Sequence, residues 1–395
     1  MADILRISAA FLLIVVLLRR KVSVGRVMLL GSVFLSAAYL MPPRSMLGAV
    51  WKALADPVTL ELAVALSLIR VFELVLRERE ILGEMTEASK ALLRNRKAAM
   101  VSMPLLIGML PSVGGAYFSA PMVDEATKRV AMPQEEKAFV NYWFRHPWEF
   151  VLPLYPGIVL ASALTGIELR TLIAANLVPA ALMALGGFLL AMRGVRGRPR
   201  PRKLSRKGLL SFLPIASVLF LVVALHVELY ASFAIVLAGL FIYHRYPARG
   251  VAAALKRGFS LDVIVLIFGV MLFKTTMEES GAVSALSAYF TSKGIPLMPM
   301  LFMLPFVTGI LTGITVGYVG AAFPLLMSLA GGGSAASIAF AFASGFIGVL
   351  LSPVHVCLVL TREYFKADMG GIYRRTVPAG ALVLAGAAVV YLVIG

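Results

Sequence analysis

The Gly-rich stretch LPFVTGILTGITVGYVGAAFPLL (304–326) is followed closely by SGFIGVLLSPVHVCLVLTREYF (344–365), an apolar run broken by Pro353. The first pattern predicts two helical arms joined at a glycine-rich tip, and the second predicts a helix interrupted at the proline. Irregular backbone at membrane depth leaves NH and CO groups unpaired unless protein or a water-filled cavity surrounds it. The two segments together therefore predict a membrane protein with a polar site inside the bilayer.

The same order of parts occurs earlier in the chain. There MPLLIGMLPSVGGAYFSAPMV (103–123) precedes the proline-broken run FRHPWEFVLPLYPGIVLAS (144–162). The distribution of Lys and Arg, described below, places the entry of one hairpin on the inside and that of the other on the outside. The repeated order therefore predicts an inverted-topology repeat, which is typical of secondary transporters. Gly and Pro that only kink ordinary packed spans are the alternative interpretation. The two re-entrant hairpins are expected at 98–126 and 298–331, and the two broken spans at 138–163 and 336–361.

The composition excludes a soluble protein. Of 395 residues, 60% are hydrophobic and 14% are charged, and the mean hydropathy is +0.91, whereas a soluble domain is roughly 45–50% apolar and about 25% charged. The expected fold is an all-α polytopic membrane protein, with a scaffold and a transport subdomain and about ten transmembrane helices besides the hairpins. These spans are expected near 4–18, 25–41, 58–77, 138–163, 168–192, 209–226, 229–246, 260–279, 336–361 and 373–394.

The basic residues predict the orientation. The net charge is +17, and most Lys and Arg lie in loops that fall on one side when both termini are placed outside. We therefore expect a multi-pass protein of the cytoplasmic (inner) membrane that contacts membrane lipid and binds no nucleic acid. Its parts are N-terminal scaffold spans at 1–57, a first repeat at 58–192, a basic cytoplasmic linker at 193–208, and a second half at 209–395.

Several motifs resemble known membrane families. The order of hairpins and broken spans resembles the ion transporter superfamily, which includes divalent-anion/sodium symporters and gluconate-type permeases. The segments LPSVGGAYFSAP (110–121), NYWFRHPWEF (141–150) and LSPVHVCLVLTREYF (351–365) are more closely similar to a membrane family numbered 401 among domains of unknown function. This resemblance covers the chain from about residue 58 to its end.

The superfamily resemblance implies a homodimer formed through the scaffold, with a transport subdomain that moves in elevator fashion, driven by Na+ or H+. The dicarboxylate symporters of that superfamily carry Ser-Asn-Thr at their hairpin tips. Here the only asparagines are Asn95, Asn141 and Asn176, and none lies at a tip. The resemblance therefore does not extend to the substrate or the sodium sites of that branch.

The hairpin tips carry the first group of candidate site residues. Hydroxyl groups and closely approached glycine backbone can bind an anion or coordinate a cation. Tight helix packing by small residues is the alternative. The substrate-binding candidates are Ser112, Gly114, Gly115 and Ser119 in the first tip, and Thr312, Gly313, Thr315 and Gly317 in the second. A Na+ ion, if bound, is expected near Ser112, Gly115, Thr312 and Thr315.

The first broken span holds Arg145, His146 and Glu149. Ionisable residues inside a span are costly in lipid and are usually functional. Arg145 could bind a carboxylate or phosphate in bidentate fashion, or form an ion pair with Glu149 four residues on. His146 could bind substrate or transfer protons. A solvated position near the cytoplasmic interface is the alternative for this cluster.

The second broken span adds Ser352, Pro353 and His355. His355 follows the proline by two residues, so it is expected near the break, either as a ligand or proton carrier or as a satisfied core histidine. Cys357 is interpreted as a small packing residue.

Four carboxylates are candidate coupling groups: Glu149, Glu73, Glu278 and Asp124. Glu73 follows Arg70 by three residues and Glu278 follows Lys274 by four, so each pair shares a helix face. A structural ion pair is the alternative to a coupling role.

These observations predict a secondary active transporter that moves a small, anionic organic solute, with no cofactor other than Na+ or H+ as the coupling ion. The chain contains no Walker sequence and no HExxH or CxxC motif, so no enzyme is expected. The alternatives are an intramembrane enzyme that uses His146, Glu149, His355 and Cys357, and a channel or scaffold protein.

Overall fold

The computed structural model describes residues 2–92, 96–111, 115–127, 132–191, 205–294, 296–330 and 333–395. Within these ranges every regular element is a helix and none is a strand. The all-helical class expected from the composition is therefore confirmed.

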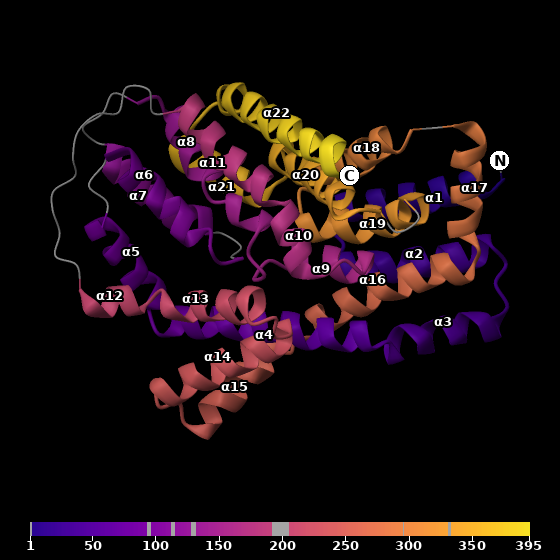
Figure 1. Ribbon diagram of the computed structural model, residues 1–395, viewed down its shortest axis with the longest axis horizontal. Coiled ribbons are helices and arrows are strands. Elements are labelled where there is room, and N and C mark those ends of the chain that lie inside the picture. Colours follow the sequence, from indigo (N-terminus) through magenta and orange to yellow (C-terminus); the bar gives the residue numbers. More distant parts are fainter. Residues whose placement is uncertain are drawn as a thin grey trace.

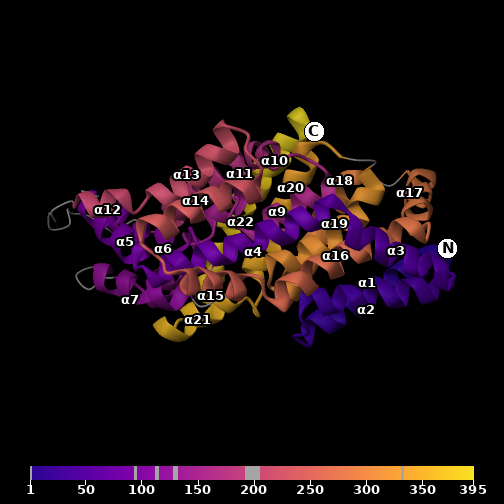
Figure 2. The same cartoon turned by 90° about the horizontal axis from the view of Figure 1, so that it is seen from below.

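The N-terminal part consists of three helices. They are α1 (Ala2–Arg19), α2 (Val24–Ala38) and α3 (Pro43–Ala55). The third was not expected from the sequence, because its hydropathy is interrupted by Arg44 and Lys52. Figures 1 and 2 place these helices at one end of the molecule.

The first half continues through shorter helices. In chain order they are α4 (Pro57–Glu78), α5 (Ile81–Leu92), α6 (Arg96–Ile107), α7 (Gly115–Thr127), α8 (Gln134–Trp143), η1 (Pro147–Phe150), α9 (Pro156–Thr165), α10 (Leu169–Ala175) and α11 (Leu177–Leu190). Helices α6 and α7 pack against each other within the predicted hairpin segment 98–126. They lie with α5 at the end of the molecule opposite to α1–α3 (Figures 1 and 2).

The second half begins after the basic segment. Its elements are α12 (Arg206–Leu210), α13 (Leu213–Leu219), η2 (Phe220–Ala224), α14 (Leu229–Tyr243), α15 (Ala248–Gly258), α16 (Leu261–Glu279), α17 (Ala282–Lys293), α18 (Leu297–Thr312), α19 (Thr315–Ala330), α20 (Ala335–Leu351), α21 (Val356–Phe365) and α22 (Met369–Ile394). Helices α18 and α19 pack together within the predicted hairpin segment 298–331. Most of the predicted linker 193–208 lies outside the described residues.

Long apolar helices identify a multi-pass membrane protein. In the described ranges, four are long and apolar enough to cross a bilayer: Arg206–Ala224, Ala248–Glu279, Ala335–Phe365 and Met369–Ile394. A fifth span results if Pro156–Thr165 and Leu169–Ala175, bent by 114° at their junction, count as one. The ten spans stay a prediction, because several of them are divided into helices shorter than a bilayer crossing.

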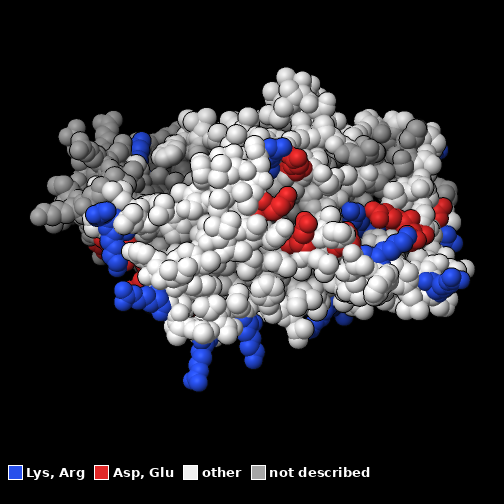
Figure 3. Space-filling model, turned by 60° about the horizontal axis from the view of Figure 1, so that its bottom comes forward, with Lys and Arg blue, Asp and Glu red and all other residues white. Residues whose placement is uncertain are grey.

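The surface of the molecule is consistent with a membrane protein. Large apolar side chains such as Leu40, Trp51, Ile242 and Leu261 are more than two-thirds exposed. Figure 3 shows a face on which uncharged residues dominate and charged side chains gather in a few separate groups. An apolar exterior of this kind is suited to contact with lipid.

Helix α20 forms the centre of the core. All its residues from Ala336 to Leu350 are buried, and it packs against α18 and α22. Glycines bring the α18 and α20 backbones into direct contact. A Cβ atom on Gly309 would lie 2.1 Å from the carbonyl oxygen of Gly345, and one on Gly348 would lie 2.2 Å from that of Phe306. Only glycine permits such an approach.

This contact predicts that Gly348→Ala destabilises the protein by about 1–3 kcal/mol, because the added methyl group must push two helix backbones apart. The matched control is Gly239→Ala in α14, where no described atom lies within 4 Å of a built Cβ. Thermal unfolding of the purified protein in detergent should show a lower melting temperature for Gly348→Ala only. Equal melting temperatures for the two variants would contradict the proposed backbone contact.

Candidate functional site

Two interruptions of helical structure meet in the core. In the first half, α8 ends at Trp143 and α9 begins at Pro156, with only the short η1 between them. In the second half, α20 ends at Leu351 and α21 begins at Val356. Prolines within both gaps cannot donate a backbone hydrogen bond and clash with the preceding turn, so the helices stop there. We call these segments, residues 144–155 and 352–355, the first and second breaks.

Side chains bond the carbonyl groups that the second break leaves free. The Tyr142 hydroxyl donates to the Leu350 carbonyl oxygen at 2.9 Å, and the Tyr373 hydroxyl donates to that of Leu351 at 3.0 Å. The last turn of α20 therefore keeps its hydrogen bonds without continuing as a helix.

The helices next to the breaks are bonded in the same way. The Tyr155 hydroxyl donates to the Gly108 carbonyl oxygen just beyond the end of α6. The Ser352 hydroxyl donates to the Ile310 carbonyl oxygen of α18 at 2.6 Å. Ser352, expected to bind substrate, thus has a structural partner in the neighbouring hairpin.

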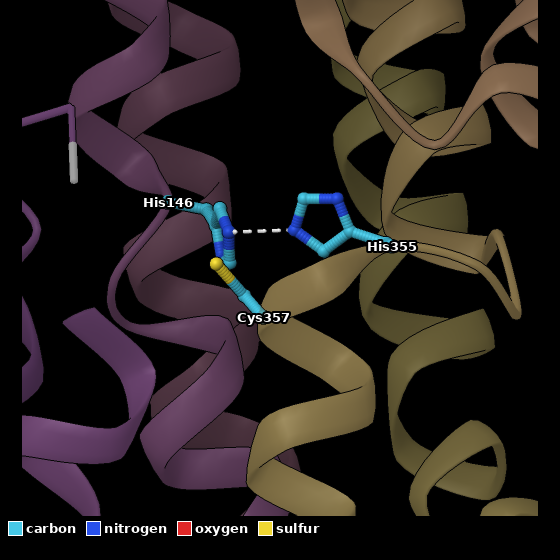
Figure 4. Close-up of side chains that lie close together, drawn as sticks. All are labelled: His146, His355 and Cys357. Atoms are coloured by element: carbon cyan, nitrogen blue, oxygen red, sulfur yellow. Dashed lines mark hydrogen bonds between the residues drawn. The ribbon is translucent and has the colours of Figure 1, made fainter. Parts of the chain in front are cut away.

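The two breaks touch through a pair of histidines (Figure 4). The Nε2 atoms of His146 and His355 lie 3.3 Å apart. The Nδ1 atom of His146 lies 2.6 Å from the Tyr142 carbonyl oxygen, and that of His355 lies 2.8 Å from the Gly313 carbonyl oxygen. Both imidazoles are almost fully buried, at 3% and 9% exposure. The structure therefore brings together two residues that the sequence proposed separately.

Glu149 connects the first break to the second hairpin. Its carboxylate, 9% exposed, accepts a hydrogen bond of 2.7 Å from the Thr315 hydroxyl. The neighbouring Gly157 lies so close that a Cβ there would be 2.4 Å from the Thr315 methyl carbon. The first turns of α9 and α19 are therefore in contact.

The start of α21 joins the same meeting point. Gly313, with φ +63°, ends α18 in a left-handed conformation, and a Cβ there would lie 3.0 Å from the backbone nitrogen of His355. His355 is the residue that precedes α21. The N-termini of α9, α19 and α21 thus converge around Gly313 and Thr315.

Arg145 is buried without a complete set of partners. Its side chain is 4% exposed, and within the described residues its Nε and Nη1 atoms have no hydrogen-bond acceptor. The expected alternative of an ion pair with Glu149 does not form in the described part of the chain, where the Glu149 carboxylate accepts a hydrogen bond from Thr315. A buried guanidinium with free NH groups is costly unless something anionic completes its bonding.

The family to which the chain belongs can be stated against this geometry. A family described as "Protein of unknown function (DUF401)" matches residues 5–394, which include both breaks and both hairpins. The chain belongs to the DUF401 family. No curated protein matches the sequence. The family resemblance predicted from the sequence is confirmed, and the relation to the ion transporter superfamily stays a prediction.

The remaining tip residues of this DUF401 protein have varied positions. Ser112 and Gly114 lie outside the described residues, and Gly115 begins α7. The hydroxyl of Ser119 bonds to carbonyls of its own helix, which fits the packing interpretation. In the second tip, a Cβ on Gly317 would touch Thr312 at 3.2 Å. Pro353, which lies in the second break, is exposed.

Three of the four coupling candidates lie apart from the breaks. Glu73 pairs with Arg77 at 3.0 Å, whereas Arg70 donates to the Ser260 hydroxyl. Asp124 pairs with Lys137 at 2.8 Å. Glu278 is exposed in the last turn of α16. Of the four, only Glu149 belongs to the convergence of helix ends.

Two features of the DUF401 site were not expected from the sequence. The buried Asn141 amide donates to the Ala116 carbonyl oxygen and to the Thr361 hydroxyl, both at 3.0 Å, and so joins α7, α8 and α21. Cys357 was interpreted as a packing residue, but its sulfur lies beside the histidine pair. The spacing His-x-Cys at 355–357 is a local signal for the second feature.

We expect Tyr142→Phe to lower the stability of the protein by about 1–3 kcal/mol, because the buried Leu350 carbonyl loses the Tyr142 hydroxyl as its donor. Tyr243→Phe is the matched control, since Tyr243 is 73% exposed. Thermal unfolding in detergent measures the difference. A melting temperature for Tyr142→Phe equal to that of the control would show that the hydroxyl contributes nothing to the break.

Proposed function

We propose that this protein is a secondary active transporter that moves a small, anionic organic solute across the cytoplasmic membrane, coupled to Na+ or H+. The observation that carries the proposal is the buried Arg145 guanidinium with two unpaired NH atoms at the first break. A free cationic group inside an apolar bundle marks a place where an anion can bind.

The convergence of helix ends supports an anionic substrate. Helix N-termini carry unpaired NH groups and a partial positive charge, which attract anions. In the described part of the chain, Tyr155 and His355, the residues that precede α9 and α21, form no side-chain cap to their helices. Arg145 and Tyr155 also both contact Gly108. The Arg145 backbone and the start of α9 therefore border the same turn.

The Glu149–Thr315 pair supports coupling to a cation. A carboxylate and a hydroxyl offer the oxygen ligands that Na+ prefers, and the carboxylate alone can accept a proton. The pair lies at the same convergence as the proposed anion site. A cation bound there would offset the charge of the incoming solute.

An inverted repeat and alternating access find support in the similar build of the two halves. Each half has a helical hairpin, a helix that stops at a break, and then a ten-residue helix, α9 or α21. Both ten-residue helices end at a left-handed residue, Gly166 with φ +70° and Lys366 with φ +49°. We propose that the hairpins and breaks form a transport subdomain that moves elevator-fashion against a scaffold through which two chains dimerise.

The proposed orientation places both termini outside. Two ion pairs support placing the two ends of α16 on opposite sides of the membrane. Glu279, in its last turn, pairs with Lys52, whereas Arg257, just before its first turn, pairs with Glu78 at the end of α4. The first pair would face outside and the second the cytoplasm.

Single-cysteine labelling tests this orientation. In a Cys357→Ser background, a membrane-impermeant thiol reagent should label Lys52→Cys in intact cells and Lys256→Cys only after permeabilisation. Both positions are exposed, so labelling reports sidedness. The reverse pattern would invert the topology.

Ligand binding tests the anion site. Carboxylates, sugar acids and phosphates should be screened by thermal shift, in Na+ and in choline and at two pH values. A ligand at about 100 times its Kd stabilises the folded protein by about 2.7 kcal/mol. Arg145→Gln should weaken binding of the active anion by roughly tenfold or more. Arg170→Gln is the matched control, because Arg170 is exposed and pairs with Glu168.

Transport is measured with the same anion in liposomes. The wild type should accumulate it under a Na+ or H+ gradient, and Glu149→Gln should lose accumulation while facilitated exchange persists. Conduction without any gradient dependence would indicate a channel. Failure of the purified protein to move any anion of the panel under either gradient would falsify the proposed transport.

A further inference from the structure

A compact group of metal-binding side chains lies where the two breaks meet. One donor atom each from His146, His355 and Cys357 lies within 4.8 Å of the others. Figure 4 shows the two imidazole rings facing each other and the sulfur drawn next to the His146 ring, with His146 on the first break and the other two residues at the start of α21. No other such group occurs in the described residues.

The hydrogen bonds of the two imidazoles fix their tautomers. Each Nδ1 atom faces a backbone carbonyl, at Tyr142 and at Gly313, and a carbonyl only accepts hydrogen bonds. Both Nδ1 atoms therefore carry hydrogen. In neutral rings both Nε2 atoms are then bare acceptors, yet they face each other at 3.3 Å. Two buried lone pairs at this distance repel, so the arrangement calls for a positive species between them.

The distance matches a metal ion. Two nitrogens bound at about 2.0–2.1 Å to a tetrahedral Zn2+ lie about 3.3–3.4 Å apart. The observed Nε2 separation is 3.3 Å. Nitrogen and thiolate sulfur on the same ion lie about 3.6 Å apart, so Cys357 would need a closing movement on the order of 1 Å.

The surroundings complete a metal site. Histidines that bind a metal commonly donate their other ring NH to a carbonyl or carboxylate, which orients the ring. Both imidazoles already have this bond. Two imidazoles and one thiolate are a set that favours Zn2+ and similar transition metals over Na+, Mg2+ or Ca2+.

We propose that His146, His355 and Cys357 bind one transition-metal ion of the Zn2+ class, with a fourth coordination position left open. The ion would join the first break to the second by direct bonds. This proposal is independent of the proposed transport, because it concerns the binding of a metal and not the movement of a solute.

Metal titration of the full-length protein in detergent tests the site. After removal of metals with a chelator, the protein should bind one equivalent of Zn2+ per chain, measured by competition with a chromophoric chelator. Co2+ should produce the visible absorption of a tetrahedral ion and a thiolate-to-cobalt charge-transfer band. Zn2+ should also raise the melting temperature, because it binds only the folded state.

The variants separate this site from adventitious binding. Cys357→Ser should abolish the charge-transfer band while keeping the fold, since serine has nearly the same shape. His146→Gln and His355→Gln should each weaken Zn2+ binding by roughly tenfold or more. His244→Gln, at the distant end of α14, should bind like the wild type.

Three results would overturn the proposal. The first is Co2+ binding without a thiolate band, and the second is Zn2+ binding that is equally strong in Cys357→Ser. The third is the absence of stoichiometric Zn2+ binding to the wild type, in which case a proton shared by the two Nε2 atoms accounts for their approach. If the histidine variants do not fold, the spectrum of Cys357→Ser still decides between these outcomes.

Discussion

Every backbone NH or CO group inside an apolar bundle needs a partner, and this requirement governs the centre of the protein. Two helices stop in the core, and each stop frees backbone groups that need another partner. Tyr142 and Tyr373 supply donors to the end of α20, and Ser352 supplies one to α18. Tyr142 comes from the opposite half of the chain, whereas Tyr373 and Ser352 lie in the same half as their acceptors. The breaks persist because side chains around them complete these hydrogen bonds.

The same requirement explains why polar side chains accumulate at this point. Once irregular backbone is present, the cost of burying further polar groups falls, because partners are available. Asn141, Glu149 and both histidines each have at least one partner within the core. Arg145 differs, because two of its side-chain nitrogens have no partner among the described residues. The side-chain oxygen of Asn141 is likewise unpaired there.

The sequence predicts the positions of the two breaks better than it predicts their contact in the fold. Gly and Pro locate both breaks, and the cost of ionisable groups in lipid singles out His146 and His355. Their contact joins residues 209 positions apart, and no local periodicity encodes it. Charge spacing alone misassigned the partner of Glu73, because both Arg70 and Arg77 lie within one turn of it on the helix. Arg70 donates a hydrogen bond to Ser260, which is distant in sequence, and Glu73 pairs with Arg77.

The glycine contact between α18 and α20 has a mechanical consequence. Sliding one helix along the other would bring side chains into a gap that admits only hydrogen atoms, at Gly309 and at Gly348. The contact between α18 and α20 therefore resists sliding, and we expect the two helices to move as one rigid unit. Any deformation of the protein is therefore expected outside the α18–α20 interface.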